Sequence, residues 1–291
     1  MSKLNDFIKY NPVSVALTEK YVNARTRDVE AYIFMATTGR SGSKSLARVF
    51  EAADNAVTYH EPYPIMFSHF PDLDKPPKGT ARRKYFRDLF YTKKGINIKR
   101  NAIGHRYYVE TNHQFIKNFA DFAVDYFKDK IRIIHVFRDP VKVASSFYSI
   151  ESIPDTTPRG KVYAIDPRDE ENIIKMDDLL YHDEEFKEPF FKCLWYWYEL
   201  HSRTKKYKEK YPFVRWHTMN TDDMNDRKKL IEMFTALGVA YHPDKLEEVV
   251  GTRSNRVPHM KKQAIDPDKA NEMHQKLLTK MVERYGENFW L

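Results

Sequence analysis

Two groups of residues in this chain have the types and spacing needed to bind an anion. The first follows a hydrophobic run, Ala31 to Ala36, and opens a helical pattern. It consists of Arg40, Ser41, Gly42, Ser43, Lys44 and Ser45. A strand, a tight loop with Gly and a helix start place backbone N–H groups beside cations, which is an arrangement that binds phosphate. The pattern therefore predicts a site for a phosphate or sulfate ester.

The second group lies at the end of another buried-strand run, Ile131 to Phe137. Arg138 follows this run directly, and Pro140 is typical of a helix start. Ser146 comes eight residues after Arg138, about two helical turns on. A guanidinium and a hydroxyl at this spacing can hold one phosphate from two sides.

The first loop alone also allows a nucleotide-triphosphatase interpretation. Lys44 and Ser45 stand where such a loop carries its Lys and Ser/Thr, but Ser43 and Thr38 occupy positions that require Gly. The enzymatic alternative is thus a P-loop kinase of small molecules, with Asp139 on Mg²⁺. A nucleotide- or polyanion-binding module is the alternative without catalysis.

At this order and separation, the two groups resemble the 5′-phosphosulfate and 3′-phosphate motifs of sulfotransferases that use 3′-phosphoadenosine 5′-phosphosulfate (PAPS). The TGRSGS wording and the later YHEP, Tyr59 to Pro62, are most similar to the carbohydrate and protein-tyrosine branch. The resemblance implies PAPS as donor, the desulfonated product PAP, and no metal. It assigns the loop from Arg40 to Ser45 to the 5′-phosphosulfate, and Arg138 and Ser146 to the 3′-phosphate.

The resemblance extends to three further segments. Trp216 stands where an aromatic residue is common near the adenine, and the loop Gly251 to Lys262 resembles one that closes over the 3′-phosphate. The resemblance assigns two cations of this loop, Arg256 and Lys261, to binding of the cofactor. A polar motif at the end of a central strand is similar to one that lines the acceptor cleft; it consists of Glu110, Thr111 and Asn112. A helix N-cap by Thr111 or Asn112 is an equally good interpretation.

The acceptor's proton needs a base, and two neighbours qualify. Glu61 follows a short strand and precedes Pro62, which should hold the backbone extended and point the carboxylate into the cleft. His60 is the alternative, because its ordinary pKa suits proton transfer at neutral pH. Adjacent strand residues point to opposite faces, so we expect only one of them to face the acceptor. The YHEP resemblance favours Glu61.

Composition sets the broader limits. The chain has 291 residues, 42% hydrophobic residues and a net charge of +8. That charge suits an anionic cofactor, but also nucleic acid or an anionic membrane; no nucleic-acid-binding signature accompanies it. Cys193 is the only cysteine, no run of 18 apolar residues occurs, and the His residues lack metal-ligand spacing. We expect a soluble, cytoplasmic protein without a metal; nothing indicates its oligomeric state.

Alternating strand and helix patterns predict the fold. Five runs are typical of strands: Ala31 to Ala36, Val57 to Tyr59, Tyr107 to Glu110, Ile131 to Phe137 and, more weakly, Phe213 to Trp216. Helical patterns cover Ser43 to Ala53, His113 to Phe127, Val141 to Tyr148, Pro189 to Tyr207, Asp226 to Leu237 and Pro267 to Tyr285. This alternation indicates a single α/β domain with a mainly parallel sheet flanked by helices, like P-loop nucleotide triphosphatases. Ligands bind such sheets at the carboxyl ends of the strands.

Other segments modify this plan. Residues 1–30 are expected to form a lead-in with a short helix, and residues 31–291 the domain itself. Phe70 to Asn101 should be an excursion with one helix near Ala81 to Tyr91. Lys205 to Lys210 should be a solvated helix end. 

Residues 166–188 form an acidic insertion with ten acidic and three basic residues. As a lid over the acceptor, this insertion would attract a cationic amine or guanidinium metabolite, such as a saxitoxin-type alkaloid, and disfavour a polyanionic carbohydrate. A hydroxyl or amine of such a metabolite, or of a carbohydrate, would receive the sulfuryl group. The alternative is a solvated loop that offsets the basic cleft.

Overall fold

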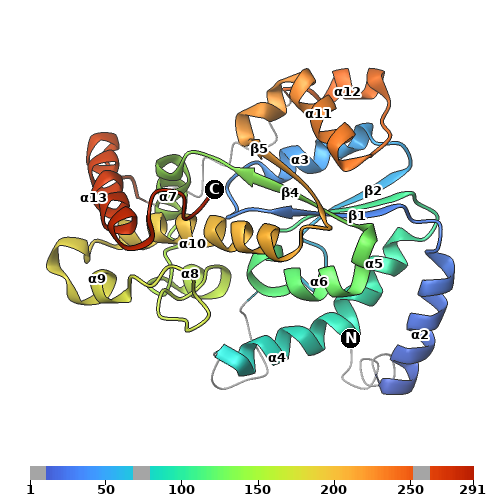
Figure 1. The fold of residues 1–291 in the computed structure, drawn as a ribbon, viewed down its shortest axis with the longest axis horizontal. Coiled ribbons are helices and arrows are strands. Elements are labelled where there is room, and N and C mark those ends of the chain that lie inside the picture. Colours follow the sequence, from blue (N-terminus) through green and yellow to red (C-terminus); the bar gives the residue numbers. More distant parts are fainter. Residues whose placement is uncertain (1–10, 68–78, 252–262) are drawn as a thin grey trace.

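The centre of the protein is a five-stranded parallel sheet with the order β2-β3-β1-β4-β5 (Figure 1). The computed structural model describes residues 11–67, 79–251 and 263–291. The strands are β1 (Ala31–Ala36), β2 (Ala56–His60), β3 (Tyr107–Thr111), β4 (Ile131–Phe137) and β5 (Arg215–Asn220). The predicted α/β class with a parallel sheet flanked by helices is confirmed.

Helices cover both faces of the sheet (Figure 1). One face packs against α3 (Ser43–Val49), α11 (Arg227–Leu237) and α12 (Pro243–Val249). The other packs against α6 (Ala120–Phe127), α7 (Pro140–Ser149) and α10 (Pro189–Lys210), and α13 (Pro267–Tyr285) packs in turn on α7 and α10. Because both faces are covered, all six residues of β1 are buried, and strands of this kind are apolar throughout.

The connections of β1 and β4 create a crevice at the carboxyl edge. These strands are neighbours, with Ala36 paired to His135. The chain leaves β1 for α3 on one face, whereas it leaves β4 for α7 on the other. Diverging connections of this kind open the ligand-binding crevice of α/β sheets. Both predicted anion loops therefore lie at this point.

Several elements differ from the sequence predictions. The lead-in contains the 14-residue helix α2 (Pro12–Arg25). The excursion carries two helices, α4 (Gly79–Leu89) and α5 (Gly95–Ala102), joined by a π-helical turn at Phe90–Lys94. A second π-helical turn, Phe115–Phe119, precedes α6, so the predicted helix from His113 is not continuous. The fifth strand starts at Arg215 and runs to Asn220, because its polar residues pair with β4 at the edge of the sheet.

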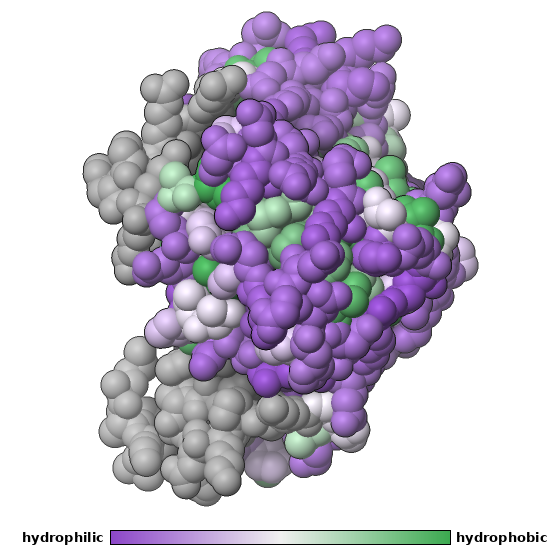
Figure 2. Space-filling model, turned by 90° about the vertical axis from the view of Figure 1, so that its left-hand side faces the viewer, coloured by the Kyte–Doolittle hydropathy of each residue, from purple (hydrophilic) through white to green (hydrophobic). Residues whose placement is uncertain are grey.

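Two short helices, α8 (Pro158–Tyr163) and α9 (Asp177–His182), and a 3₁₀ turn at Glu184–Phe186 precede α10 in the chain. In the described ranges no helix is long and apolar enough to cross a membrane. Figure 2 shows the end of the molecule that carries α13, and its surface is mostly hydrophilic with small hydrophobic patches.

Ion pairs tie the acidic insertion to distant elements. Asp169 binds Arg82 of α4 at 2.8 Å, and Asp178 binds Arg284 of α13 at 2.6 Å. Lys276 of α13 binds Glu185 at 2.7 Å. These ion pairs hold the insertion against the domain and neutralise three of its ten acidic side chains.

A buried ion pair supports the loop after β2. The ammonium group of Lys94 lies 2.7 Å from a carboxylate oxygen of Glu110, and both side chains are almost fully buried. Lys94 also donates to the carbonyl of Pro62 at 2.9 Å, and Tyr108 and Asn112 donate to the same carboxylate. Burial lowers the pKa of Lys94, while Glu110 opposes that shift. The pair therefore links β3 to the segment that carries Glu61.

We expect Glu110→Gln to destabilise the protein by about 3 kcal/mol or more, because it leaves a buried ammonium without its counter-charge. Urea unfolding followed by circular dichroism measures this loss. The double variant Lys94→Met, Glu110→Leu should recover part of it, since apolar residues need no partner. Glu232→Gln, which breaks an exposed pair with Lys229, is the control and should barely move the midpoint. A small loss for Glu110→Gln would contradict the assigned role.

Candidate functional site

The loop between β1 and α3 adopts a strained, left-handed backbone. Its φ angles are +89° at Gly39, +58° at Arg40 and +80° at Gly42. Glycine adopts this conformation without a steric penalty, but Arg40 does not. Gly42 is the N-cap of α3, and no side chain caps the helix. The first N–H groups of α3 thus lack intrahelical partners and face the crevice end of the loop.

Two side chains hold this loop in place. The hydroxyl of Tyr196 in α10 donates to the carbonyl of Thr38 at 3.2 Å. Thr221, after β5, donates to the carbonyls of Ser41 at 3.3 Å and of Phe137 at 3.1 Å. The loop is therefore tied both to α10 and to the end of β4.

The two predicted anion groups meet in the structure. Arg40 donates through Nε to the hydroxyl of Ser146 at 2.9 Å, although 106 residues separate them in the chain. Arg138 donates through Nη1 to the carbonyl of Arg40 at 3.2 Å. Trp197 of α10 in turn donates to the carbonyl of Arg138 at 2.9 Å. Arg40, Arg138 and Ser146 thus form one cluster at the carboxyl ends of β1 and β4.

Positive charge dominates this cluster. Burial and the nearby charges of Arg159 and Arg138 lower the pKa of Arg40. Within the described residues, no ion pair neutralises Arg40, Arg138 or Arg159. Three guanidinium groups that repel one another favour an anion between them, and phosphate or sulfate oxygens match their geometry.

Glu61 and His113 form the second part of the site. The carboxylate oxygen Oε1 of Glu61 lies 2.5 Å from Nδ1 of His113. The φ angle of Glu61 is +50°, so the prediction that Pro62 keeps Glu61 extended is wrong. The hydrogen bond to His113 and the anchoring of the Pro62 carbonyl by Lys94 favour the left-handed turn despite its cost.

His113 is held as a neutral imidazole. Gln114 donates through Nε2 to Nε2 of His113 at 2.9 Å, which leaves Nδ1–H to donate to Glu61. Burial and the charge of Lys117 lower the pKa of His113 to about 4, although Glu61 raises it. Burial raises the pKa of Glu61, but the hydrogen bond from His113, the charge that this ring carries once it is protonated below pH 4, and the charges of His60 and Lys117 outweigh burial, and the pKa falls to about 2. An ionised carboxylate therefore faces a neutral imidazole at neutral pH.

The Glu61–His113 pair adjoins the anion loop. A Cβ atom added to Gly39 would lie 3.4 Å from His113, so the imidazole lies directly beside the loop. Lys117 lies behind the pair and donates to the carbonyl of Tyr163 at 2.7 Å and to the hydroxyl of Tyr196 at 2.9 Å. Tyr196 also binds the loop, so α10 connects both parts of the site.

His60 and Lys44 both lie at a cavity that is distinct from the surroundings of Glu61 and His113. His60 contacts the carbonyl of Thr111 through Nδ1 at 3.0 Å. Both His60 and Lys44 line a cavity of about 500 Å³ beside α3, to which Arg48 also contributes. The strand alternation thus separates His60 from Glu61, and only Glu61 lies beside His113.

The polar motif after β3 is buried. Glu110, Thr111 and Asn112 are all fully inaccessible to solvent. Glu110 is occupied by Lys94, while Asn112 binds the carbonyl of Ile65 at 3.2 Å and accepts from the backbone N–H of Gln114 at 2.9 Å. In this structure the three residues support the loops around Glu61 and His113, and none of them is open to an acceptor.

The structure does not bring Trp216 to the anion loops. Trp216 pairs with Ile133 near the amino end of β5 and donates to the carbonyl of Tyr211 at 3.4 Å. The loops lie at the opposite, carboxyl end of the sheet. The predicted loop cations Arg256 and Lys261 lie outside the described residues. Ser43 and Ser45 are half-buried in the first turn of α3, next to the capping Gly42.

Sequence reasoning missed His113 and Gln114 as site residues. Their position in the sequence could have identified them. His113 follows the end of β3 by two residues and so lies at the same edge of the sheet as Arg40 and Arg138. The helical pattern from His113 concealed it. In the part of the chain that the structure describes, no cluster of three or more His, Cys, Asp or Glu residues could hold a metal ion.

No family model matches the chain, and no curated protein is significantly similar to it. Three solved structures with a similar course of the chain are a sulfotransferase domain from the curacin biosynthetic pathway, a sulfotransferase from Alicyclobacillus acidocaldarius, and retinol dehydratase in a complex with retinol and PAP. Their sequence identities to this chain are 15%, 15% and 12%, and their TM-scores are 0.45, 0.46 and 0.39. The matches cover 86%, 87% and 91% of this chain and 96%, 95% and 86% of the other chains. Similarity at this level leaves the function to be argued from the residues themselves.

We expect the buried imidazole to make the fold sensitive to acid. The folded-state pKa of His113 is about 4, below its ordinary 6.5, so the unfolded chain binds more protons between these values and stability is lost as pH falls from 6.5 to 4. His113→Gln can still donate to Glu61 but does not titrate, so its free energy of unfolding should fall less over this window. Urea unfolding of both proteins at several pH values measures the difference. Equal pH dependence would contradict a neutral, buried His113.

Proposed function

We propose that this protein is a sulfotransferase that uses PAPS as the sulfuryl donor. The observation that carries the proposal is the contact between Arg40 and Ser146, with Arg138 on the carbonyl of Arg40. It joins the two motifs that resemble the phosphosulfate and phosphate sites of PAPS-dependent enzymes. A ligand with two separate anionic groups suits such a cluster better than a single inorganic ion does.

The residues fit the two ends of this donor. The uncapped start of α3 and Arg40 would hold the 5′-phosphosulfate, and Arg138 with Ser146 would hold the 3′-phosphate. Bound PAPS supplies an activated sulfuryl group, which passes to the acceptor while PAP leaves. The protein has to orient the donor and stabilise the negative charge that builds on the departing phosphate, and Arg40 is the cation placed for this task.

Glu61 is the group proposed to take the acceptor's proton. It is ionised at neutral pH, and His113 fixes its orientation through Nδ1–H. A carboxylate with so low a pKa is a weak base toward a free hydroxyl. It accepts the proton readily only once the hydroxyl oxygen has begun to bond to sulfur and has become more acidic. The assignment thus implies that proton transfer follows the start of sulfuryl transfer.

The acceptor is proposed as a small molecule with a hydroxyl group. The expectation of a cationic acceptor, such as a saxitoxin-type alkaloid, depended on the negative charge of residues 166–188. Three of these acidic side chains, Asp169, Asp178 and Glu185, form ion pairs with α4 and α13. Their fields are locally compensated, so the insertion offers less attraction to a cation than its composition indicates. Amine and carbohydrate acceptors remain to be compared with simple alcohols and phenols in the same assay.

PAP should stabilise the protein against heat without a metal, because Arg side chains and helix N–H groups provide the positive charge. The expected thermal shift with PAP should persist in EDTA and exceed the shift with ATP and Mg²⁺.

Arg138→Ala should weaken PAP binding by about 2 kcal/mol or more, as expected for a charge-assisted contact. Isothermal titration calorimetry measures this change. 

Lys142→Ala, which removes an exposed cation from α7, the helix that follows Arg138, is the matched control and should bind PAP nearly as the wild type does. A shift that requires Mg²⁺ and prefers ATP would instead support the small-molecule kinase. Binding of PAP without any PAPS-dependent transfer would support a nucleotide-binding module.

Glu61→Gln should lower the rate of sulfuryl transfer by about 10² while PAP affinity stays nearly constant, because the amide keeps the shape but takes no proton. The assay follows PAP release from PAPS with an acceptor selected from a panel of hydroxyl compounds. His60→Ala is the matched control, since His60 lies in the cavity beside α3. If His60→Ala abolishes transfer while Glu61→Gln does not, the base assignment is wrong.

A further inference from the structure

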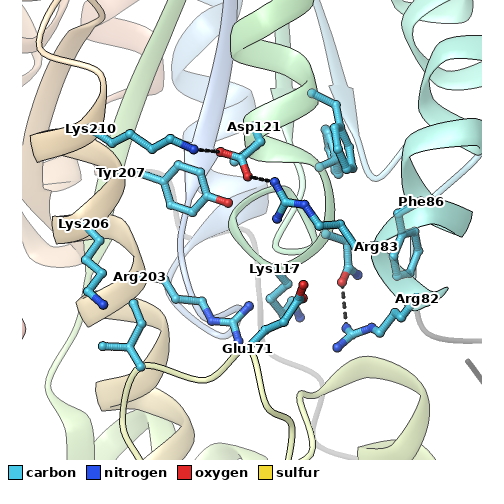
Figure 3. Close-up of a pocket in the computed structure, with 15 residues that line it drawn as sticks. Arg82, Arg83, Phe86, Lys117, Asp121, Glu171, Arg203, Lys206, Tyr207 and Lys210 are labelled. Atoms are coloured by element: carbon cyan, nitrogen blue, oxygen red, sulfur yellow. Dashed lines mark hydrogen bonds and ion pairs between the residues drawn. The ribbon is translucent and has the colours of Figure 1, made fainter. Parts of the chain in front are cut away.

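A second cavity lies between α4, α6 and α10, away from the anion loops (Figure 3). Its volume is about 320 Å³, which is within the range of small-molecule pockets. None of the residues from Thr37 to Ser45 lines it, and neither Arg138 nor Ser146 does. The cavity is thus separate from the proposed donor site.

Buried cations form the inner wall of this cavity. Lys117 and Arg203 are each only 7% exposed. Arg203 uses Nε to bind Glu199 at 2.5 Å and Nη2 to bind Asn172 at 2.9 Å, and within the described residues its Nη1 has no partner. Lys117 has only uncharged partners, the Tyr163 carbonyl and the Tyr196 hydroxyl. Burial lowers the pKa of Lys117 well below its ordinary value, and an anion placed beside Lys117 and Nη1 of Arg203 would favour the charged form of the lysine.

Further cations surround the opening (Figure 3). Arg83 and Lys210 share a single carboxylate, Asp121, at 2.5 and 3.1 Å. Lys206 is exposed, and among the described residues it forms no ion pair. The lining includes six basic residues and only two acidic ones, Asp121 and Glu171. Two more carboxylates pair with lining residues, Glu199 with Arg203 and Asp169 with Arg82. When both are counted, the basic residues still outnumber the acidic ones.

Apolar rings complete the lining. Phe86, Phe119 and Phe122 contribute their side chains, with Ala120 and Ile173 between the polar groups. The three rings are at most 7% exposed, so they form an apolar wall; an inorganic ion would leave the space beside this wall to water, whereas a flat organic body would fill it. The lining therefore matches a ligand that has one negative group and an aromatic or similarly flat apolar part.

We propose that this cavity binds a small organic anion, an aromatic carboxylate or sulfonate, at a site separate from the donor site. The anionic group lies against Lys117 and Arg203, and the apolar body packs on Phe86 and Phe122. Lys206 and Lys210 at the opening attract the ligand. The site does not depend on the proposed sulfotransferase activity.

Isothermal titration with naphthalene-1-sulfonate tests the proposal, because this probe carries no hydroxyl or amine to be modified. The neutral 1-naphthamide and inorganic phosphate are the comparison probes. We expect the sulfonate to bind and both comparison probes to bind at least about tenfold more weakly, since each lacks one half of the ligand. Lys206→Glu should weaken sulfonate binding by about fivefold or more, because it reverses a charge at the opening.

Two matched variants localise the binding. Lys208→Glu reverses an exposed charge on the same helix outside the cavity and should leave the affinity nearly unchanged. Arg138→Ala, in the donor site, should also leave it unchanged. Ile173→Trp fills the cavity and should abolish binding while the protein stays folded by circular dichroism. Binding lost in Arg138→Ala but kept in Lys206→Glu and Ile173→Trp would place the probe in the donor site and overturn the proposal, as would equal affinity for the neutral amide.

Discussion

The parallel pairing of β1 with β4 is the constraint on which the candidate site depends. Ala36 pairs with His135, so the chain leaves both strands within a few residues of each other and at the same edge. Arg40 then reaches Ser146 on α7, and Arg138 reaches back to the Arg40 carbonyl. A slip of one residue would move one loop by about 3.3 Å along the sheet and turn every side chain of that strand to the other face. Because β1 is buried on both faces, the packing of its individual side chains, and not a polar–apolar alternation, has to fix this register.

The positions of the charged side chains determine the electrostatic field of the site. The guanidinium groups of Arg40 and Arg138 stand at the crevice, and no carboxylate within the described residues neutralises them. The carboxylate of Glu61 lies next to the loop, and its hydrogen bond to His113 keeps it from pairing with the guanidinium groups. An anionic donor and a proton acceptor can therefore work side by side. Without His113, Glu61 would be free to turn toward the cations and fill the anion site itself.

The sequence predicted the elements that obey simple periodicities, and it failed where distant contacts decide. The runs at Ala31 and Ile131 are strands with the predicted bounds, and Pro267–Tyr285 is the predicted helix. The pairing of the two anion groups followed from their places at strand ends. The left-handed Glu61 did not, because Lys94 and His113, far away in sequence, stabilise that turn against the rule for residues before proline. The ion pairs of the insertion after residue 166 were not predicted for the same reason, since their partners on α4 and α13 are remote in the chain.

Strain at two residues explains why so many polar groups are buried around the site. Arg40 and Glu61 both have positive φ angles, which cost about 1–3 kcal/mol each for residues with a Cβ atom. Such conformations persist only where the surroundings over-determine them. Tyr196 and Thr221 hold the loop of Arg40, and the Lys94–Glu110 pair holds the loop of Glu61 through the Pro62 carbonyl. A hydrophobic replacement of that pair would remove a desolvation penalty, yet it would also release the carbonyl that fixes the turn. The buried ion pair is therefore better understood as a device for positioning Glu61 than as a source of net stability.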